Sequence, residues 1–352
     1  MEITFLIGNG FDIGVGMSSR FVDFFPLYQG QSIDKPDEIR MLSEEIGSDY
    51  KTWAAFESAL GDYTEKFSPD TKNNFFEQIK DFEISFIDYI KKQEELLSYK
   101  DVALIKGTFE KALTNFFSLD NLNKVSNNKI TRLFQKYRNE RYVCNFINFN
   151  YTDIFSKCLE VTKVNKTKEL KYNIGNIINV HGKCDFYPII GVNDISQIKN
   201  KTLANDPTFV SRIVKPTINQ LLGYNNEIDA RNIISRSAII VIYGMSMGKT
   251  DALWWDTIVQ WLNASPEFQL VLFDYDPDFQ TTVPFDWIDK NETIKNKILS
   301  FNTQKNINTN ALKDRIHIAV HKNIFEMDLM KEHRDLVDKA VNKMIDDKYL
   351  NN

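Results

Sequence analysis

Glycines and small polar residues follow directly on the first apolar run of this sequence. Residues 3–7 form that run, and Gly8-Asn9-Gly10-Phe11-Asp12 come next, with further glycines at 14 and 16. Glycine permits a sharp turn and, having no Cβ, lets backbone N–H groups approach a ligand. Many α/β proteins use a strand, a glycine-rich turn and a helix to bind phosphate. The opening therefore predicts a nucleotide-binding turn, followed by a helix that starts at Ser18 or Ser19.

The turn departs from the dehydrogenase fingerprint Gly-x-Gly-x-x-Gly, because Ile13 stands at the third glycine position. No strand with an acidic end follows about 20 residues later, as that fingerprint requires. For this stretch alone, a tight strand-to-helix turn that binds nothing remains the alternative.

Further loops with reactive or polar side chains follow other predicted strands. A strand predicted over 187–192 leads into Asn193-Asp194. The loops that we group with the N-terminal turn are Asn150-Tyr151-Thr152-Asp153 after 142–149, His181-Gly182 after 177–180, residues 244–251 after 237–243, and Asp274-Tyr275-Asp276 after 269–273. The carboxyl ends of parallel strands share one edge of a sheet, and ligands of open α/β sheets bind there. We therefore expect these loops to form one cleft of the kind that a nucleotide needs.

The predicted elements indicate an α/β fold with a Rossmann-like parallel sheet, helices on both faces and a large helical insertion. Residues 1–34 and 141–352 would form the discontinuous sheet domain, which includes a last strand over 316–320 and a closing helix over 329–345. Residues 35–140 show helical periodicity only and predict an insertion or cap. Residues 195–236 predict a helical lid, with glycines 191 and 223 as hinges.

Composition narrows the classes of function. The 352 residues carry a formal charge of −5, which argues against broad nucleic-acid binding. No apolar run is long enough for a membrane span, and the start does not resemble a signal peptide. The three cysteines lack a Cys-x-x-Cys pair, and no cluster has metal-ligand spacing. We expect a cytoplasmic protein with a small-molecule nucleotide as partner, without membrane, nucleic acid or metal; homo-oligomer formation is left open.

Two other chemistries fit residues 244–251 less well. Gly244-Met245-Ser246-Met247-Gly248-Lys249-Thr250 is similar to a phosphate-binding P-loop, but it has three residues between its glycines where four are needed, and Tyr243 replaces the first glycine. Ser246 also sits in a Gly-x-Ser-x-Gly pattern like that of esterases, but an esterase would leave the N-terminal glycines unexplained. Of the four histidines, His181 alone lies in a glycine-flanked loop at a strand end; we interpret His317 and His321 as structural.

These loops together resemble the bacteriophage abortive-infection AbiH family over nearly the whole chain. The segments that carry the resemblance are Leu6-Ile7-Gly8-Asn9-Gly10-Phe11-Asp12 with Gly16, Trp53…Phe56-Glu57…Leu60, Phe149-Asn150-Tyr151-Thr152, His181-Gly182, Gly244-Met245-Ser246-Met247-Gly248…Asp251 and Lys322-Asn323-Ile324-Phe325. The resemblance implies a role in defence against phage.

The same loops are more distantly similar to the sirtuin-like NAD-binding fold. Thr152 and Asp12 depart from the sirtuin pattern, and the four zinc cysteines are absent, so protein deacylation is disfavoured. The resemblance implies instead an NAD glycohydrolase that cleaves the nicotinamide–ribose bond with Asn150 and His181 as catalytic residues. The implied NAD-binding residues are Gly8, Asn9, Gly10, Phe11, Asp12, Tyr151, Gly244, Ser246, Asp251 and Asp274.

Two alternatives belong to other classes. A nucleotide-binding sensor would bind NAD or a related nucleotide without turnover and trigger defence through partners. A nuclease would need paired carboxylates with metal spacing, and the sequence shows no such motif.

Overall fold

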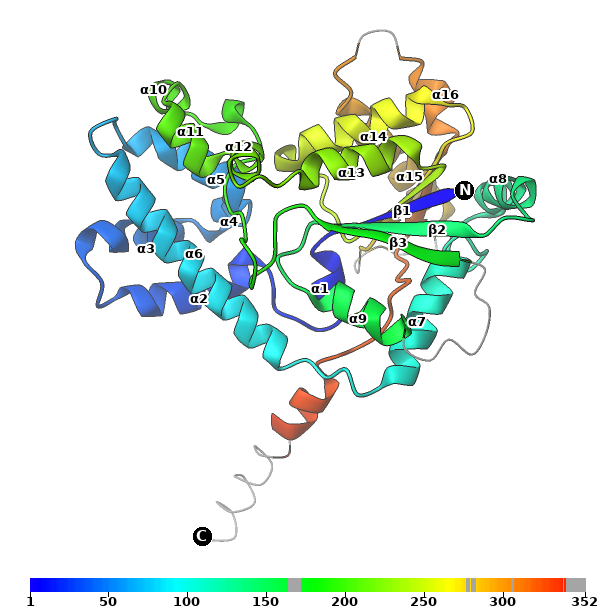
Figure 1. The fold of residues 1–352 in the computed structure, drawn as a ribbon, viewed down its shortest axis with the longest axis horizontal. Helices are drawn as coiled ribbons and strands as arrows, with labels where there is room; N and C mark the ends of the chain where they lie inside the picture. Colours follow the sequence, from blue (N-terminus) through cyan, green and yellow to red (C-terminus); the bar gives the residue numbers. More distant parts are fainter. Residues whose placement is uncertain (164–171, 277–278, 280–282, 305–306, 338, 340–352) are drawn as a thin grey trace.

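Six parallel strands form the central sheet of this computed structural model (Figure 1), which describes residues 1–163, 172–276, 279, 283–304, 307–337 and 339. The strands are β1 (Glu2–Ile7), β2 (Tyr142–Asn148), β3 (Tyr172–Asn179), β4 (Ile239–Tyr243), β5 (Gln269–Asp274) and β6 (Ile316–Val320). Their order is β3-β2-β1-β4-β5-β6, and every neighbouring pair is parallel. The predicted Rossmann-like α/β fold is confirmed.

The strands are apolar on both faces because helices cover both sides of the sheet. Phe5 and Val241 point to one core, while Leu6 and Ile242 point to the other, as the alternation of side chains along a strand requires. Ile7 pairs with both Asn148 and Tyr243, so the carboxyl ends of β1, β2 and β4 lie level with one another. This register brings the loops that follow them to one edge.

Two sets of helices complete the layers. The Leu6 face is covered by α13 (Asn226–Arg236), α14 (Ala252–Ala264), α15 (Pro284–Ser300) and α16 (Thr309–Lys313). The Phe5 face is covered by α1 (Gly10–Gly14), α7 (Val102–Asn115), α8 (Lys124–Lys136) and α9 (Ile154–Lys163). No helix within the described ranges is long and apolar enough to cross a membrane.

A helical lobe lies beside the sheet and is built from two distant segments (Figure 1). The first contributes α2 (Phe21–Ser32), α3 (Asp37–Ser48), α4 (Tyr50–Trp53), α5 (Phe56–Tyr63), η1 (Thr64–Lys66) and α6 (Lys72–Glu95). The second contributes η2 (Ile195–Gln197), α10 (Lys201–Ala204), α11 (Pro207–Ile213) and α12 (Lys215–Leu221). The two segments meet where the ring of Phe209 packs 5.1 Å from that of Phe75 and where Lys72 pairs with Asp206.

Three predicted elements differ in the structure. Residues 187–192 were predicted as a strand, which is wrong: they form an irregular segment that contacts Val214 through a single bridge from Val192. β3 begins at Tyr172 rather than at residue 177. The helix predicted from Ser18 or Ser19 begins at Phe21, where the carboxylate of Asp23 accepts a hydrogen bond from the backbone N–H of Arg20 at 3.1 Å.

The predicted closing helix over 329–345 is only partly described. Residues 331–337 are helical, and residues 338 and 340–345 lie outside the described ranges. Residues 35–140 contain helices and no strand, and residues 195–236 hold η2 and α10–α13. The predicted domain limits at 34 and 141, and the function of 195–236 as a lid, stay predictions.

Candidate functional site

The glycine turn after β1 packs against the backbone that follows β4, at the point where the strand order reverses. A Cβ on Gly8 would lie 2.5 Å from the carbonyl oxygen of Gly244, and one on Gly10 would lie 2.5 Å from the Gly244 Cα. Gly244 itself has a φ of +70°. Glycine is therefore required at these positions by the close approach of two backbones.

The backbone amides of Gly8 and Gly10, which were predicted to bind a diphosphate, form hydrogen bonds within this contact. The N–H of Gly8 donates to the carbonyl of Tyr243, and the N–H of Gly10 donates to the carbonyl of Gly244, both at 2.9 Å. Diphosphate binding by these two amides would require both bonds to be exchanged. The side chain of Asn9 bonds Ser19, whose hydroxyl donates to the Asn9 Oδ1 at 2.6 Å.

Asp12 and Asn150 come together below this turn. Asn150 Nδ2 donates to the carbonyl of Gly8 at 3.2 Å and to Asp12 Oδ1 at 3.1 Å. The hydroxyl of Thr152 donates to the other carboxylate oxygen of Asp12 at 2.7 Å. Burial raises the pKa of Asp12 to about 7, although its hydrogen bond from Thr152 works in the opposite direction. The loops after β1 and β2 are therefore joined through one buried carboxyl group.

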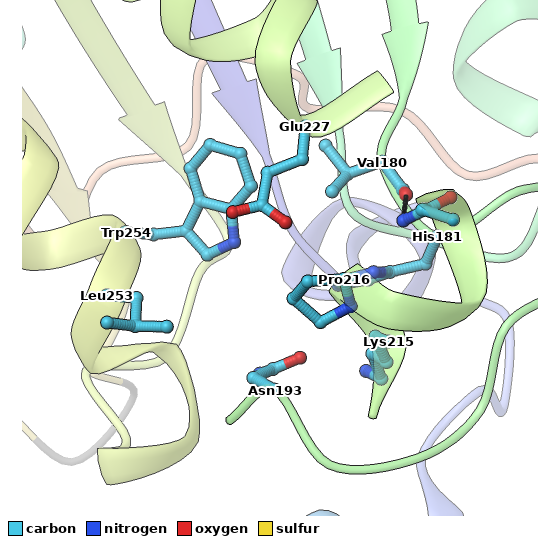
Figure 2. Close-up of a pocket in the computed structure, with 9 residues that line it drawn as sticks. Val180, His181, Asn193, Lys215, Pro216, Glu227, Leu253 and Trp254 are labelled. Carbon is cyan, nitrogen blue, oxygen red and sulfur yellow. Dashed lines mark hydrogen bonds between the residues drawn. The ribbon is translucent and has the colours of Figure 1, made fainter. Parts of the chain in front are cut away.

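His181 borders a small cavity at the same sheet edge (Figure 2). The cavity has a volume of about 10 Å³, about that of one water-sized sphere. It is lined by Val180, His181, Asn193, Lys215, Pro216, Asn219, Glu227, Leu253 and Trp254. Burial and the neighbouring Lys215 ammonium lower the pKa of His181 well below its ordinary value, so the imidazole is neutral at pH 7.

Lys215 is only 2% exposed and forms an ion pair with Glu57, from α5 of the helical lobe. Burial lowers the pKa of Lys215, but the carboxylate of Glu57 more than offsets this and holds the pKa above its ordinary value. Asn193 Nδ2 donates to Glu57 Oε2 at 3.0 Å and to the carbonyl of Thr250 at 2.7 Å. The two segments of the helical lobe and the turn before α14 (η3, Lys249–Asp251) are thus joined at the cavity wall.

Tyr151 and Asp251 extend this polar group. The Tyr151 ring centroid lies 6.2 Å from that of His181, and its hydroxyl donates to the carbonyl of Ile189 at 3.2 Å. Burial raises the pKa of Asp251 to about 7, with a further increase from the nearby Glu57 carboxylate, while a hydrogen bond with Ser246 acts against it. These predicted residues therefore lie in one electrostatic neighbourhood with His181.

An open groove of about 480 Å³ lies next to the His181 cavity and shares Leu253 with it. Its lining comes from α5, from the segment around η2 and from the start of α14. The lining residues are Ser58, Asp62, Asp194, Ser196, Gln197, Lys199, Thr250, Ala252 and Leu253. Its size falls within the range of small-molecule sites.

Two predicted binding residues lie apart from this group. Phe11 is fully buried, and its ring packs edge-on against Phe109, Phe155 and Phe325. Asp274 lies at the end of β5 and forms an ion pair with Lys290 at 3.1 Å. The first is therefore part of the core, and the second belongs to a different stretch of the sheet edge.

Glu57, Lys215 and Asn219 were not predicted as site residues. Glu57 lies within a segment that carried the AbiH resemblance, which was the available signal. Lys215 and Asn219 are charged and polar residues of a short helix, a pattern that normally indicates a solvent-exposed face. Their burial results from contacts with segments that are distant in sequence.

Side chains that ligate metals are not clustered in the part of the chain that the structure describes. Within the described ranges, no group of three or more His, Cys, Asp or Glu side chains is placed to hold a metal ion. The three cysteines are buried free thiols, and burial raises the pKa of Cys158 and of Cys184 to about 12.

Comparison with known proteins identifies the family. No curated protein matches the chain. The profile of the family described as "Bacteriophage abortive infection AbiH" matches residues 4–273, well over half of the chain. The match includes the loops after β1, β2, β3 and β4 and ends at residue 273, just before Asp274. This chain therefore belongs to the AbiH family, whose role is abortive infection in defence against bacteriophage.

Proposed function

We propose that this AbiH protein acts in defence as an NAD glycohydrolase, with its reaction centre at the carboxyl edge of β2 and β3. The observation that carries the proposal is the neutral, buried imidazole of His181 beside the loop that holds Asn150. A buried imidazole whose Nδ1 has no partner can accept a hydrogen bond from water or a ribose hydroxyl and take the proton as the new bond forms, although its lowered pKa makes it a weaker base than an exposed histidine. The resemblance to sirtuin-like domains supports NAD as the substrate.

The reaction depends more on correct orientation of the ribose and the attacking water than on a strong acid catalyst. Cleavage breaks the bond between the ribose C1′ and the nicotinamide nitrogen, and the electron pair leaves with nicotinamide, which departs neutral. Water forms the new bond to C1′ and loses a proton to His181. Both amide hydrogens of Asn150 are committed to Gly8 and Asp12, so its Oδ1 is the atom that accepts a hydrogen bond from a ribose hydroxyl.

The 480 Å³ groove has room for the rest of the nucleotide, and the wall that it shares with the cavity contains Leu253. Ser246, Asp251 and Tyr151 line neither the groove nor the cavity, and we propose that they contact the sugars once the wall has opened. NAD enters only after that wall opens, because the cavity itself has the volume of one water molecule. The outward movement of α12, within the predicted lid, is the proposed route.

The test is release of nicotinamide and ADP-ribose from NAD by purified protein, alone and with extract of phage-infected cells. The expected result is turnover by the wild type and a loss of at least about 100-fold in Asn150→Ala and His181→Ala. His333→Ala changes a histidine outside the cavity lining and should leave the rate unchanged. Equal inactivity of the wild type and Asn150→Ala in both conditions would refute hydrolysis. Saturable NAD binding without product would instead support the sensor.

A further inference from the structure

The His181 cavity contains an unusual concentration of unsatisfied polar atoms. Within the described ranges, the buried side-chain atoms with neither a hydrogen bond nor an ion pair include Tyr99 Oη, His181 Nδ1 and Asn219 Oδ1. Two of these, on His181 and Asn219, belong to residues that line this one cavity. Leaving a buried polar atom without a partner costs about 1–3 kcal/mol, so two beside one cavity indicate a shared partner.

The orientation of the Asn219 side-chain amide shows that Oδ1 is the atom without a hydrogen-bond partner. Its Nδ2 donates to the backbone carbonyl of Val180 at 3.4 Å. The reverse orientation would place two oxygens against each other. Asn219 is 4% exposed and Lys215 is 2% exposed, and both lie on α12 one turn apart. One face of α12 is therefore directed into the protein at this site.

Asn219 Oδ1 is a hydrogen-bond acceptor, and His181 Nδ1 is one in the tautomer that carries its proton on Nε2, which the proposal adopts. The Lys215 cation and the lack of exposure keep His181 neutral, which preserves that acceptor. A partner must therefore supply two donors within a volume of about 10 Å³, and a water molecule meets both conditions.

We propose that this cavity binds one water molecule, which donates to Nδ1 of His181 and Oδ1 of Asn219, and that Asn219 is a positioning residue for its attack on the substrate. The second part rests on the proposed function. In the reaction, the water oxygen bonds to C1′ of the ribose, its proton passes to His181 Nδ1, and nicotinamide leaves with the electron pair. Asn219 holds the second hydrogen and thereby directs a lone pair away from the cavity wall.

The water site is tested by ¹⁵N NMR of protein with labelled histidine, which is tractable because the chain has four histidines. Asn219→Leu keeps the branched shape of the side chain at a larger volume, and it removes both the Oδ1 acceptor and the Nδ2 donor to Val180. Asn226→Leu is the matched control, since Asn226 at the start of α13 bonds the Asn179 carbonyl at 3.0 Å and does not line the cavity. The proposal expects a hydrogen-bonded, unprotonated Nδ1 in the wild type and control, and a shifted Nδ1 resonance in Asn219→Leu. An unchanged resonance would overturn it.

Steady-state kinetics tests the positioning role. For Asn219→Leu we expect kcat for NAD hydrolysis to fall on the order of 100-fold with little change in KM, because the water is misplaced while the nucleotide still binds. Equal kcat values for Asn219→Leu and Asn226→Leu, with an active wild type, would overturn the inference and leave the proposed function intact. A wild type that is inert but shows the hydrogen-bonded Nδ1 would refute hydrolysis and support the water site.

Discussion

Lys215 and Glu57 form a buried ion pair between residues 158 positions apart in the sequence. Glu57 lies in the first turn of α5 in the helical lobe, and Lys215 is the first residue of α12. Lys215 also lines the His181 cavity, where burial first and the Lys215 cation second lower the pKa of that imidazole. The pair thus joins the two segments of the helical lobe and places a cation beside the histidine.

Breaking this pair should destabilise the fold strongly. Lys215→Met leaves the Glu57 carboxylate without its cation, and we expect a loss of about 3–5 kcal/mol in the free energy of unfolding, measured by urea denaturation. The double variant Lys215→Met/Glu57→Gln should lose less than the sum of the two single variants. Lys136→Met removes an exposed pair with Glu267 and should have no measurable effect. Additive losses in the double variant would contradict a direct coupling.

Asp12 should make stability depend on pH between about 4 and 7. Its pKa is raised by burial from 3.8 to about 7, so over this range the unfolded chain has released the proton while the folded chain retains it. Stability from this group is therefore highest below pH 4 and falls until pH 7. Compared with Asp12→Asn, the wild type should lose about 4 kcal/mol across the window, since each pKa unit corresponds to about 1.4 kcal/mol.

Denaturation of both proteins at several pH values tests this difference and cancels contributions from other groups, including Asp251 and Glu83, whose pKa values burial also raises to about 7. If the free energy of unfolding changes with pH in the same way for the wild type and Asp12→Asn, the Asp12 carboxyl group is not isolated from water.

His181 should remain neutral well below the pH at which an exposed histidine titrates. Its pKa is lowered by burial and by the Lys215 cation. The unfolded chain binds the proton near pH 6.5 and the folded chain does not, so this residue lowers stability as the pH falls below 6.5. NMR resonances of the His181 ring should not move between pH 8 and 6. A titration midpoint inside that range would contradict the buried environment described here.

Gly244 should not tolerate alanine. Its φ of +70° disfavours a side chain, and a Cβ would lie 2.7 Å from the Cα of Gly10 and 2.8 Å from the backbone nitrogen of Phe11. We expect Gly244→Ala to lower the free energy of unfolding by more than about 2 kcal/mol. Gly107→Ala is the control, because Gly107 lies inside α7 with open space around it and should gain about 0.5–1 kcal/mol. Similar values for the two variants would rule out a tight junction.

The sheet could be predicted from the sequence because its strands are short apolar runs that are buried on both faces. β4 and β6 illustrate this, since each is buried along its whole length. β3 was predicted too short because it is the edge strand and its first half carries polar residues on a partly exposed face. Residues 187–192 are equally apolar, but their side chains pack against α11 and α12 without a neighbouring strand.

Only some residues of the candidate site could be predicted from the sequence. Asn150 and His181 were found because each follows a strand, and the parallel sheet brings their loops to one edge. Lys215, Glu57 and Asn219 could not be found in this way, because their burial depends on the lobe packing over the sheet edge. Nothing in the local sequence of a short polar helix indicates that its charged face will be covered.

The glycine junction between the turns after β1 and β4 determines which side of the site can move. Two backbone hydrogen bonds of 2.9 Å and the direct contact of three glycines join these two turns through their backbones. The junction holds the ends of β1 and β4 in place. If α12 acts as the proposed lid, substitutions that alter its packing should change the rate of ligand entry before they change the rate of the chemical step.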